Sequence, residues 1–569
     1  MRRFVSVSLL LLACAMLSSC GGEDDTPLNV TLLGLNDFHG NLMPSTFNGM
    51  RIQDPAFPND DTKTVAIQAG GIEALASAVK QERAANVNTV VVGSGDLIGA
   101  TPLISSLLRD EPSIAALSAL GLEYSSVGNH EFDQGKQELQ RMQNGGCNSN
   151  AADKACKFMA TYTGARFKYL AANVIERASG KSLFDAYAIK EIEGVKIAFI
   201  GAVVKLTPTI VTPTGVAGLD FNDEADTINA LVPELRAQGV RTMIVLIHEG
   251  GTATEPYSAR NCATLAGPIV DIARRLDKAI DVVMSGHTHQ GYQCRVDGRL
   301  VVQGDFYGHL LSKVELAIDR RTGAVSSSNA DMIVVDTAKY PKDPAMTAII
   351  DSARKITDAI ANQPVARLAV AQISRDFSAA GETYLGDVIA DAQLDATSAA
   401  DKGGAVVAFM NSGGIRASLP PLPSTTNEVS FGDVFTVQPF GNTLVTLDLT
   451  GAQIRTLLEQ QWLGQATPRI LQVSAGFSYT IDNRQVAGSK IIAASIKING
   501  VVVDPARIYR VTVNNFLAAG GDNFVVLKEG KNQKGGDLDV DALADYLKKK
   551  ASAGTPVGNP PRNRIAIIG

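Results

Sequence analysis

Histidine is scarce in this sequence, long apolar runs are few, and neither sign of charge is in large excess. Only 6 of its 569 residues are histidine, so the places where they occur carry information. A net charge of −6 argues against a general nucleic-acid binder, which needs a basic face. With 45% hydrophobic and 19% charged residues, the composition also excludes a disordered or fibrous chain. What remains is a globular protein with enough chain for at least two packed cores.

The only notable apolar run near the N-terminus is short. Arg2 and Arg3 precede 14 mostly apolar residues, 4–17, which is too few for a comfortable membrane span but typical of a secretory signal. The next residues, Leu17-Ser18-Ser19-Cys20, resemble the bacterial lipoprotein box. That resemblance implies cleavage before Cys20 and its lipidation, whereas an ordinary signal with an incidental cysteine is the alternative.

We therefore expect an exported protein that is held on an envelope membrane by lipid at Cys20. The segment Gly21 to Pro27 is polar and suits a flexible tether. The C-terminal residues are not an apolar tail, so we do not expect a second anchor there. The choice between inner and outer membrane, and between a periplasmic and a cell-surface face, stays open. The expected segments are a signal over 1–19 and a tether over 20–28.

Four cysteines remain once Cys14 and Cys20 are assigned to the signal and the lipid. An even number in an exported chain predicts disulfides, and four cysteines allow three pairings. Loop closure favours the two shortest loops. None of the four lies beside a histidine or a CxxC partner, so we expect no catalytic role. The favoured pairs are Cys147–Cys156 and Cys262–Cys294.

The chain divides into two regions of different texture. Short Val-, Ile- and Leu-rich runs alternate with helical patterns over 29–342, which predicts an α/β layered domain. Asp343-Pro344 then begins an apolar pattern at helical spacing, so we expect a connecting helix over 343–362. Residues 363–569 read as a second, α+β domain. The strands expected in the first domain are Val30–Leu35, Thr89–Val92, Ile197–Ala202, Thr242–Ile247, Asp281–Met284 and Leu300–Gln303.

Five of the six histidines follow hydrophobic runs, beside Asp, Asn or Gly. Because α/β folds build their sites at the carboxyl ends of strands, these side chains are expected to meet. Asp, His and Asn donors without thiolates suit divalent metals, and residues i and i+2 of an extended or turning segment can share one ion. Each motif alone is a common surface turn or helix cap, and only their ordered conjunction predicts a metal site. The motifs are Asn36-Asp37-Phe38-His39-Gly40, Gly95-Asp96, Gly128-Asn129-His130-Glu131-Phe132-Asp133, His248-Glu249-Gly250 and Gly286-His287-Thr288-His289.

This order of motifs resembles the calcineurin-like metallophosphoesterase superfamily. The resemblance implies a four-layered α/β/β/α domain that holds two divalent ions, with Asp96 bridging them. His130 and Asp133 would form the catalytic pair near the leaving group. The implied ligands are Asp37, His39 and His289 for one ion and Asn129, His248 and His287 for the other. Zn, Mn, Fe and Co all fit these donors.

Three turns in the second region carry residues suited to a nucleoside. Asn411-Ser412-Gly413-Gly414-Ile415-Arg416 follows a predicted strand, Val406–Met410, and Gln438-Pro439-Phe440-Gly441-Asn442 places an aromatic ring on a turn. Asn514 to Asp522 places Phe516 before a Gly-Gly-Asp turn. Two aromatic rings can stack a flat base between them. On composition alone, both rings would more often belong to the core.

These motifs resemble the C-terminal domain of the 5′-nucleotidase family, which follows a metallophosphoesterase domain. The resemblance implies that Phe440 and Phe516 stack the base and that Asn411 and Asp522 bind base and ribose. Arg416 would bind ribose or phosphate, and Arg375 is a second, looser candidate. Two departures, Ser412 and Asn523 where the family often has glycine, affect substrate preference rather than reaction type.

The sequence therefore predicts a monomeric dinuclear-metal phosphohydrolase acting on nucleoside 5′-monophosphates, with no nucleic-acid polymer as partner. Nucleotide sugars and other nucleotides are further possible substrates. The alternatives are a 2′,3′-cyclic phosphodiesterase with 3′-nucleotidase activity and a non-catalytic surface lipoprotein that binds nucleotides. The sixth histidine, His309, has no evident partner in sequence, and we expect a structural role for it.

Overall fold

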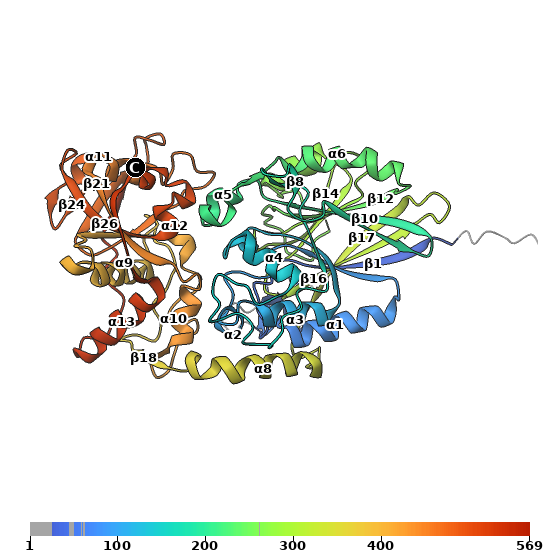
Figure 1. The fold of residues 1–569 in the computed structure, drawn as a ribbon, viewed down its shortest axis with the longest axis horizontal. Coiled ribbons are helices and arrows are strands. Elements are labelled where there is room, and N and C mark those ends of the chain that lie inside the picture. The colour runs from blue at the N-terminus through green and yellow to red at the C-terminus, as the bar shows by residue number, and fades with distance from the viewer. Residues whose placement is uncertain (1–25, 45–49, 58–59, 61–62, 261) are drawn as a thin grey trace, which may run out of the picture.

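The computed structural model describes residues 26–44, 50–57, 60, 63–260 and 262–569. The predicted signal, most of the tether and Cys20 lie outside these residues. Two bodies stand side by side, and helix α8 runs along the first of them towards the second (Figure 1). In the part of the chain that the structure describes, no helix is long and apolar enough to cross a membrane.

The N-terminal body is built on two six-stranded sheets. All six strands that the sequence predicts are present in them, with ends that differ by no more than a few residues. The first sheet has the order β17 (Val325–Val334), β16 (Leu310–Ile318), β1 (Leu28–Leu35), β4 (Thr89–Ser94), β5 (Leu122–Ser126) and β6 (Lys168–Leu170). The second has the order β14 (Gly291–Val296), β15 (Arg299–Gly304), β13 (Val282–Met284), β12 (Thr242–His248), β10 (Val195–Val203) and β9 (Tyr187–Ile192).

The two sheets pack face to face, and helices cover their outer faces. Successive side chains of a strand point to opposite faces, so Leu32 lies in the core between the sheets while Leu33 packs under the outer helices. Ile244 and Val245 of β12 divide in the same way between the inner core and the other helical layer. The result is the predicted four-layered α/β/β/α domain. Its helices are α1 (Ile72–Ala85), α2 (Leu103–Ser106), α3 (Glu111–Leu120), α4 (Lys136–Asn144), α5 (Thr207–Ile210), α6 (Glu224–Ala237) and α7 (Pro268–Arg275).

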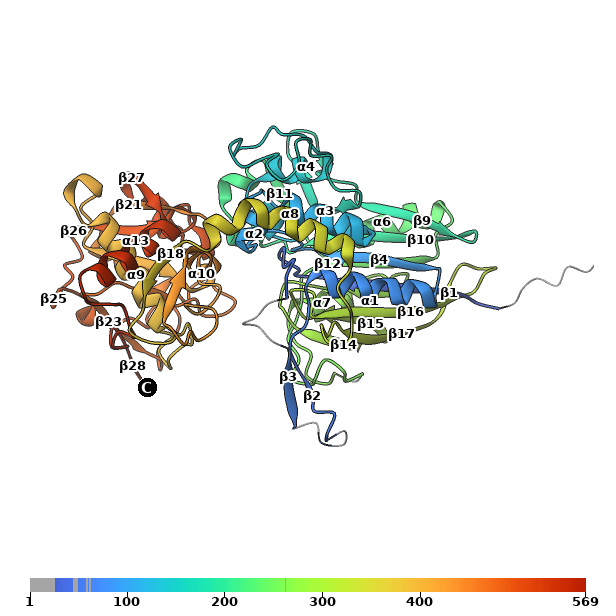
Figure 2. The same cartoon turned by 90° about the horizontal axis from the view of Figure 1, so that it is seen from below.

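Two smaller sheets complete this body. A hairpin of β2 (Met50–Gln53) and β3 (Thr64–Ile67) projects from it (Figure 2). A three-stranded sheet has the order β11 (Leu219–Phe221), β7 (Val174–Glu176) and β8 (Lys181–Ser182).

The connecting helix is present as α8 (Pro344–Ala361). Its N-cap is Asp343, whose carboxylate accepts hydrogen bonds from the backbone N–H groups of Ala345 and Met346. Met346 and Ile350 pack into the helical layer of the first domain. The first two turns of α8 are thus anchored on the first domain, and its far end leads into the second.

The C-terminal body has a five-stranded sheet with helices on both faces. Met410 of β19 faces the core under α9 and α13, whereas Phe409 faces the core under α11. The sheet has the order β22 (Leu471–Val473), β19 (Val407–Asn411), β26 (Ile508–Asn514), β21 (Thr443–Thr450) and β27 (Lys531–Leu538). The helices are α9 (Tyr384–Thr397), α10 (Phe431–Val437), α11 (Gly451–Glu459), α12 (Asn515–Ala518) and α13 (Asp539–Ser552). Smaller sheets hold β18 (Pro364–Arg367) with β20 (Glu428–Ser430), and β25 (Val501–Val502), β24 (Lys497–Ile498), β23 (Phe477–Asp482) and β28 (Ile565–Ile568).

Both favoured disulfides are present. Cys147 is bonded to Cys156, and Cys262 is bonded to Cys294 on β14. The loop-closure argument therefore selected the observed pairing from three, and the two bonds suit a chain that folds in an oxidising compartment.

Candidate active site

The seven predicted metal ligands converge where the two sheets of the first domain end. Asp37 and His39 follow β1, Asp96 follows β4, and Asn129 follows β5. These three strands are parallel neighbours, so their carboxyl ends lie together. From the second sheet, His248 ends β12, and His287 and His289 follow the adjacent parallel strand β13.

The ligand atoms gather in two groups. In each group, Asp37, His39 and His289 or Asp96, His248 and His287, the atoms lie within 4.8 Å of one another. One Asp96 oxygen, Oδ2, is 3.0 Å from Nε2 of His248 in its own group and 3.7 Å from Nε2 of His39 in the other. Asp96 thus occupies the position between the two groups that a bridging ligand requires.

The protonation of the histidines leaves lone pairs that suit cations. Nδ1 of His39 lies 2.8 Å from the carbonyl of Gly99, and Nδ1 of His248 lies 2.7 Å from the carbonyl of Ser94. A carbonyl only accepts hydrogen bonds, so each Nδ1 carries a proton and each Nε2 is turned towards the Asp96 carboxylate, where a metal ion would bind.

Two of these ligand atoms make no well-formed hydrogen bond, and two others crowd each other. Nε2 of His248 and Oδ1 of Asn129 are buried without a hydrogen bond of good geometry. Nε2 of His39 and Nε2 of His289 face each other at 3.2 Å. Buried polar atoms are costly when unpaired, so this donor set fits two divalent cations.

The backbone around the ligands is strained. Five of the seven have left-handed φ angles, between 46° and 75°, which non-glycine residues adopt at a cost of about 1–3 kcal/mol each. Such a conformation persists only when the surroundings enforce it. The strained ligands are Asp37, His39, Asp96, His287 and His289.

Glu131 is one of the groups that enforce this conformation. Its buried carboxylate accepts hydrogen bonds from the backbone N–H groups of Asp96 at 2.8 Å, Leu97 at 2.8 Å and Gly128 at 2.6 Å. It therefore ties the loop after β4 to the loop after β5. Burial and the Asp96 carboxylate raise the pKa of Glu131 to about 7. The sequence motif contains Glu131, but nothing in the motif indicates this role.

A second support comes from the loop over residues 304–309. The backbone N–H of Tyr307 donates to the carbonyl of Asp37 at 2.8 Å, and the ring of Phe306 stacks on His289 with centroids 5.0 Å apart. The sixth histidine, His309, has a partner after all: its Nδ1 lies 2.9 Å from Oδ2 of Asp305. His309 is buried, and it braces the loop that contacts the ligands.

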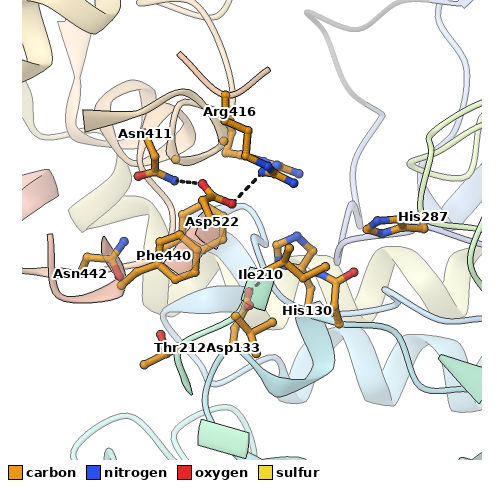
Figure 3. Close-up of a pocket in the computed structure, with 16 residues that line it drawn as sticks. His130, Asp133, Ile210, Thr212, His287, Asn411, Arg416, Phe440, Asn442 and Asp522 are labelled. Atoms are coloured by element: carbon orange, nitrogen blue, oxygen red, sulfur yellow. Dashed lines mark hydrogen bonds and ion pairs between the residues drawn. The ribbon is translucent and has the colours of Figure 1, made fainter. Parts of the chain in front are cut away.

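His130 lies between the metal ligands and the second domain. Its Nδ1 is 2.8 Å from Oδ2 of Asp133, and its backbone N–H donates to Oδ1 of Asp96 at 2.8 Å. Burial lowers the pKa of His130, but the Asp133 and Asp96 carboxylates outweigh burial, so the pKa is raised. Its ring stacks against Phe440 of the second domain, with centroids 5.8 Å apart. Asp133 thus fixes an imidazole that faces the cleft between the domains (Figure 3).

A cavity of about 190 Å³ lies in this cleft and takes its walls from both domains. Phe440, Asn411, Arg416, Asp522 and His130 line it (Figure 3). Phe516 and Asn129 line it as well. Sequence reasoning missed several other lining residues. Asn442 stands in a quoted motif, but Ile210, Thr212 and Arg469 belong to no motif, and only the folded chain brings them here.

Arg375 lies elsewhere. It lines a neighbouring cavity of about 580 Å³, together with Arg416, Asp96 and His289. Its guanidinium donates to the carbonyls of Ile415, at 2.9 Å, and Arg416. Arg375 therefore supports the loop that carries Arg416 and faces the metal side of the cleft rather than the nucleoside side.

The fold and this site define a metallophosphoesterase domain joined to a second, α+β domain. Comparison with known proteins agrees. Residues 30–291 match the family model described as calcineurin-like phosphoesterase, and residues 361–529 match the model of the 5′-nucleotidase C-terminal domain.

Relatives that match almost all of this chain have varied names. The chain is 32% identical to cell wall protein Lmo0130 of Listeria monocytogenes over 93% of this chain and 68% of that protein. It is 31% identical to endonuclease YhcR of Bacillus subtilis over 96% of this chain, but it spans only 41% of that protein. A 5′-nucleotidase of Vibrio parahaemolyticus is 24% identical over 96% of this chain and 95% of its own length.

A solved structure extends the likeness to three dimensions. The crystal structure of a 5′-nucleotidase precursor from Thermus thermophilus matches with a TM-score of 0.73 and 27% identity, covering 95% of this chain and all of that one. The chain belongs to the 5′-nucleotidase family.

Replacing Asp96 tests whether it serves both ion sites. We expect the wild-type protein to bind two equivalents of Zn²⁺ or Mn²⁺. In Asp96→Asn the metal affinity should fall by more than about 100-fold, because loss of a group that only supports a ligand typically costs about 10–100-fold. Titration calorimetry and elemental analysis after dialysis measure this. Asp545→Asn, at an exposed aspartate, is the control. Unchanged stoichiometry and affinity in Asp96→Asn would contradict the assignment.

Replacing Glu131 tests its role as a support. A glutamine in its place has one acceptor oxygen for the amide groups that the carboxylate holds, so we expect Glu131→Gln to weaken metal binding about 10–100-fold. The free energy of unfolding should fall by about 1–3 kcal/mol. Denaturant unfolding and metal titration measure the two effects, with the exposed Glu191→Gln as control. Wild-type values for both would show that the two loops hold their positions without Glu131.

Proposed function

We propose that this protein releases phosphate from nucleoside 5′-monophosphates with two divalent metal ions. The observation that carries the proposal is the shared cleft, in which His130 lines the same cavity as Phe440, Phe516 and Asp522. A group suited to phosphoryl chemistry and a set of groups suited to a nucleoside thus face one small space. The family assignment supports a phosphoesterase, and the 5′-nucleotidases among its relatives support the substrate.

The second domain would hold the nucleoside. Phe440 and Phe516 would stack the base, an interaction that contributes about 1–3 kcal/mol per base in nucleic-acid complexes. Asp522 and Asn411 offer an acceptor and a donor to the ribose hydroxyls. The guanidinium of Arg416, 5.9 Å from the Phe440 ring centroid, would offset phosphate charge.

The first domain would supply the chemistry. Hydrolysis forms a bond from a water oxygen to phosphorus and breaks the bond from phosphorus to the 5′ oxygen, which leaves with a proton. When bound, two cations at the Asp and His groups would withdraw charge from the phosphoryl oxygens and lower the pKa of the attacking water. Because Asp133 holds Nδ1 of His130, the Nε2 atom is available to stabilise the phosphoryl group or to protonate the leaving oxygen.

A phosphodiesterase is the second candidate. The cavity that Arg375 and Arg416 line, about 580 Å³, adjoins the metal ligands and offers space for a second organic group on the phosphate. The names of two relatives, endonuclease YhcR and trifunctional nucleotide phosphoesterase YfkN of Bacillus subtilis, also point to wider substrates. The candidates here are 2′,3′-cyclic nucleotides and nucleotide sugars.

We also infer export of the chain and its lipid attachment through Cys20. Two disulfides and a relative named as a cell wall protein support export. The anchor rests on the lipoprotein-like motif alone. Mass spectrometry of the protein purified from membranes would detect the acylated N-terminal cysteine.

Turnover of a substrate panel by metal-replete protein separates the candidates. We expect AMP to be hydrolysed with a higher kcat/KM than 3′-AMP, 2′,3′-cyclic AMP or UDP-glucose. Phosphate release and chromatography of the products measure this. A clear preference for the cyclic nucleotide or the nucleotide sugar would overturn the proposal in favour of the second candidate, and no turnover at all would favour a binding protein.

Replacing His130 tests its part in the chemistry. We expect His130→Ala to lower kcat on the order of 10²-fold or more, because a positioned acid or charge-stabilising group is lost. Metal stoichiometry should stay at the wild-type value, since His130 lies in neither ligand group. Wild-type activity with full metal content would refute the role.

A further inference from the structure

Arg469 is a cationic residue in the nucleoside cavity that the mechanism above does not use. It lies just before β22, in the second domain, and lines the cavity together with Asn411, Phe516 and Asp522. Its Nη1 atom is 2.7 Å from Oδ1 of Asp522. The guanidinium makes no further hydrogen bond within the described part of the chain, and its side chain is 38% exposed. Part of its donor capacity is therefore free beside the cavity.

Asp522 is held from several sides at once. Its Oδ2 accepts a hydrogen bond from Nδ2 of Asn411 at 3.1 Å, and its backbone carbonyl accepts one from Nε2 of Gln465 at 2.6 Å. Its φ angle is +53°, a left-handed value that the short turn imposes. Asn411 is itself oriented, because its Oδ1 accepts from Nδ2 of Asn514 at 3.0 Å. The carboxylate thus has one fixed position and a donor on each oxygen.

Arg469 is the only cation bonded to this buried carboxylate among the described residues. Asp522 is 5% exposed, and burial raises the pKa of its carboxyl group, whereas Arg469 and Asn411 lower it. Without Arg469, the carboxylate would lose its counter-charge and one of the two contacts that fix its orientation. The guanidinium therefore favours the ionised form of Asp522 and fixes the orientation of its carboxylate.

A ribose cis-diol is complementary to such an arrangement. Each hydroxyl has one O–H donor and two lone pairs. The ionised carboxylate accepts from the two O–H groups, and the free guanidinium N–H groups and the Asn411 amide can donate to the two oxygens. A 2′-deoxyribose lacks one of these hydroxyls and leaves a buried acceptor and a donor without partners.

From this geometry, and building on the proposed function, we propose that Arg469 makes the site selective for ribonucleotides over 2′-deoxyribonucleotides. Arg469 acts by fixing Asp522 and by donating to the diol, so it is a specificity-determining residue rather than a catalytic one. A site built to bond a hydroxyl rejects the analogue that lacks it because its own polar groups are then left unpaired. We expect the wild-type kcat/KM for AMP to exceed that for 2′-deoxy-AMP by about 10-fold or more.

Removing the guanidinium should reduce the selectivity. In Arg469→Gln we expect the ratio of the two kcat/KM values to fall to about 3 or less, chiefly through a higher KM for AMP. Arg469→Lys keeps the charge but loses the planar fork, so its ratio should lie between those of wild type and Arg469→Gln. The matched control is Arg484→Gln, in the same domain, where an exposed arginine pairs with Asp482 at 2.7 Å and does not line the cavity. Thermal melts check that every variant folds.

Binding measurements separate this proposal from the proposed function. Calorimetry with adenosine and 2′-deoxyadenosine on chelator-treated protein needs no turnover. We expect tighter binding of adenosine in wild type and a smaller difference in Arg469→Gln. If neither nucleotide is hydrolysed but this pattern holds, the reaction assignment fails and the role of Arg469 stands.

Two results would overturn the role of Arg469. One is an unchanged ribose-to-deoxyribose ratio in Arg469→Gln, both in turnover and in binding. The other is an equal loss of affinity for both nucleosides, which would assign Arg469 to the base or to the support of the cavity wall.

Discussion

The structure depends on an electrostatic requirement at Asp96. Its carboxylate lies 3.0 Å from one imidazole nitrogen and 3.7 Å from another, and those nitrogens belong to two separate ligand groups. The Nδ1 atom of each ring is hydrogen-bonded to a backbone carbonyl, so the Nε2 atoms and the Asp96 carboxylate oxygens face one another in a buried space. Buried lone pairs without positive partners are costly, and two bound cations would remove that cost. Most other features of the first domain serve to keep these atoms close.

The fold meets this requirement by bringing together the ends of two sheets and straining the loops there. Five ligands adopt left-handed backbone angles. Hydrogen bonds of Glu131 and of the 304–309 loop with the backbone of the ligand loops stabilise them. Strain of this kind is tolerated where the surrounding packing enforces it. The four-layered domain supplies that packing, since its cores lie on both faces of each sheet. The favourable free energy of core packing thus offsets the backbone strain of the ligand loops.

The order of short motifs predicted much of this organisation. The ligand loops could be located because each follows a short run rich in Val, Ile and Leu. In an α/β domain such a run forms a buried strand, so the Asp, Asn or His after it lies at a strand end. The supporting residues, and the arginine to which we assign specificity, were not predictable in the same way. Glu131 is recognisable only from the amide groups that it meets, and Arg469 meets Asp522 across 53 residues of sequence. His309 has no partner until the loop folds and places Asp305 beside it. Such contacts depend on tertiary geometry, which spacing along the chain does not encode.

The central claim is that these ligands hold two ions with Asp96 between them. Anomalous X-ray diffraction from crystals grown with Mn²⁺ or Zn²⁺, recorded on both sides of the metal absorption edge, tests it most directly. The account predicts two anomalous peaks, one at Asp37, His39 and His289 and one at His248, His287 and Asn129, both within bonding distance of Asp96. A single peak, peaks at other residues, or side chains turned away from one another would contradict it.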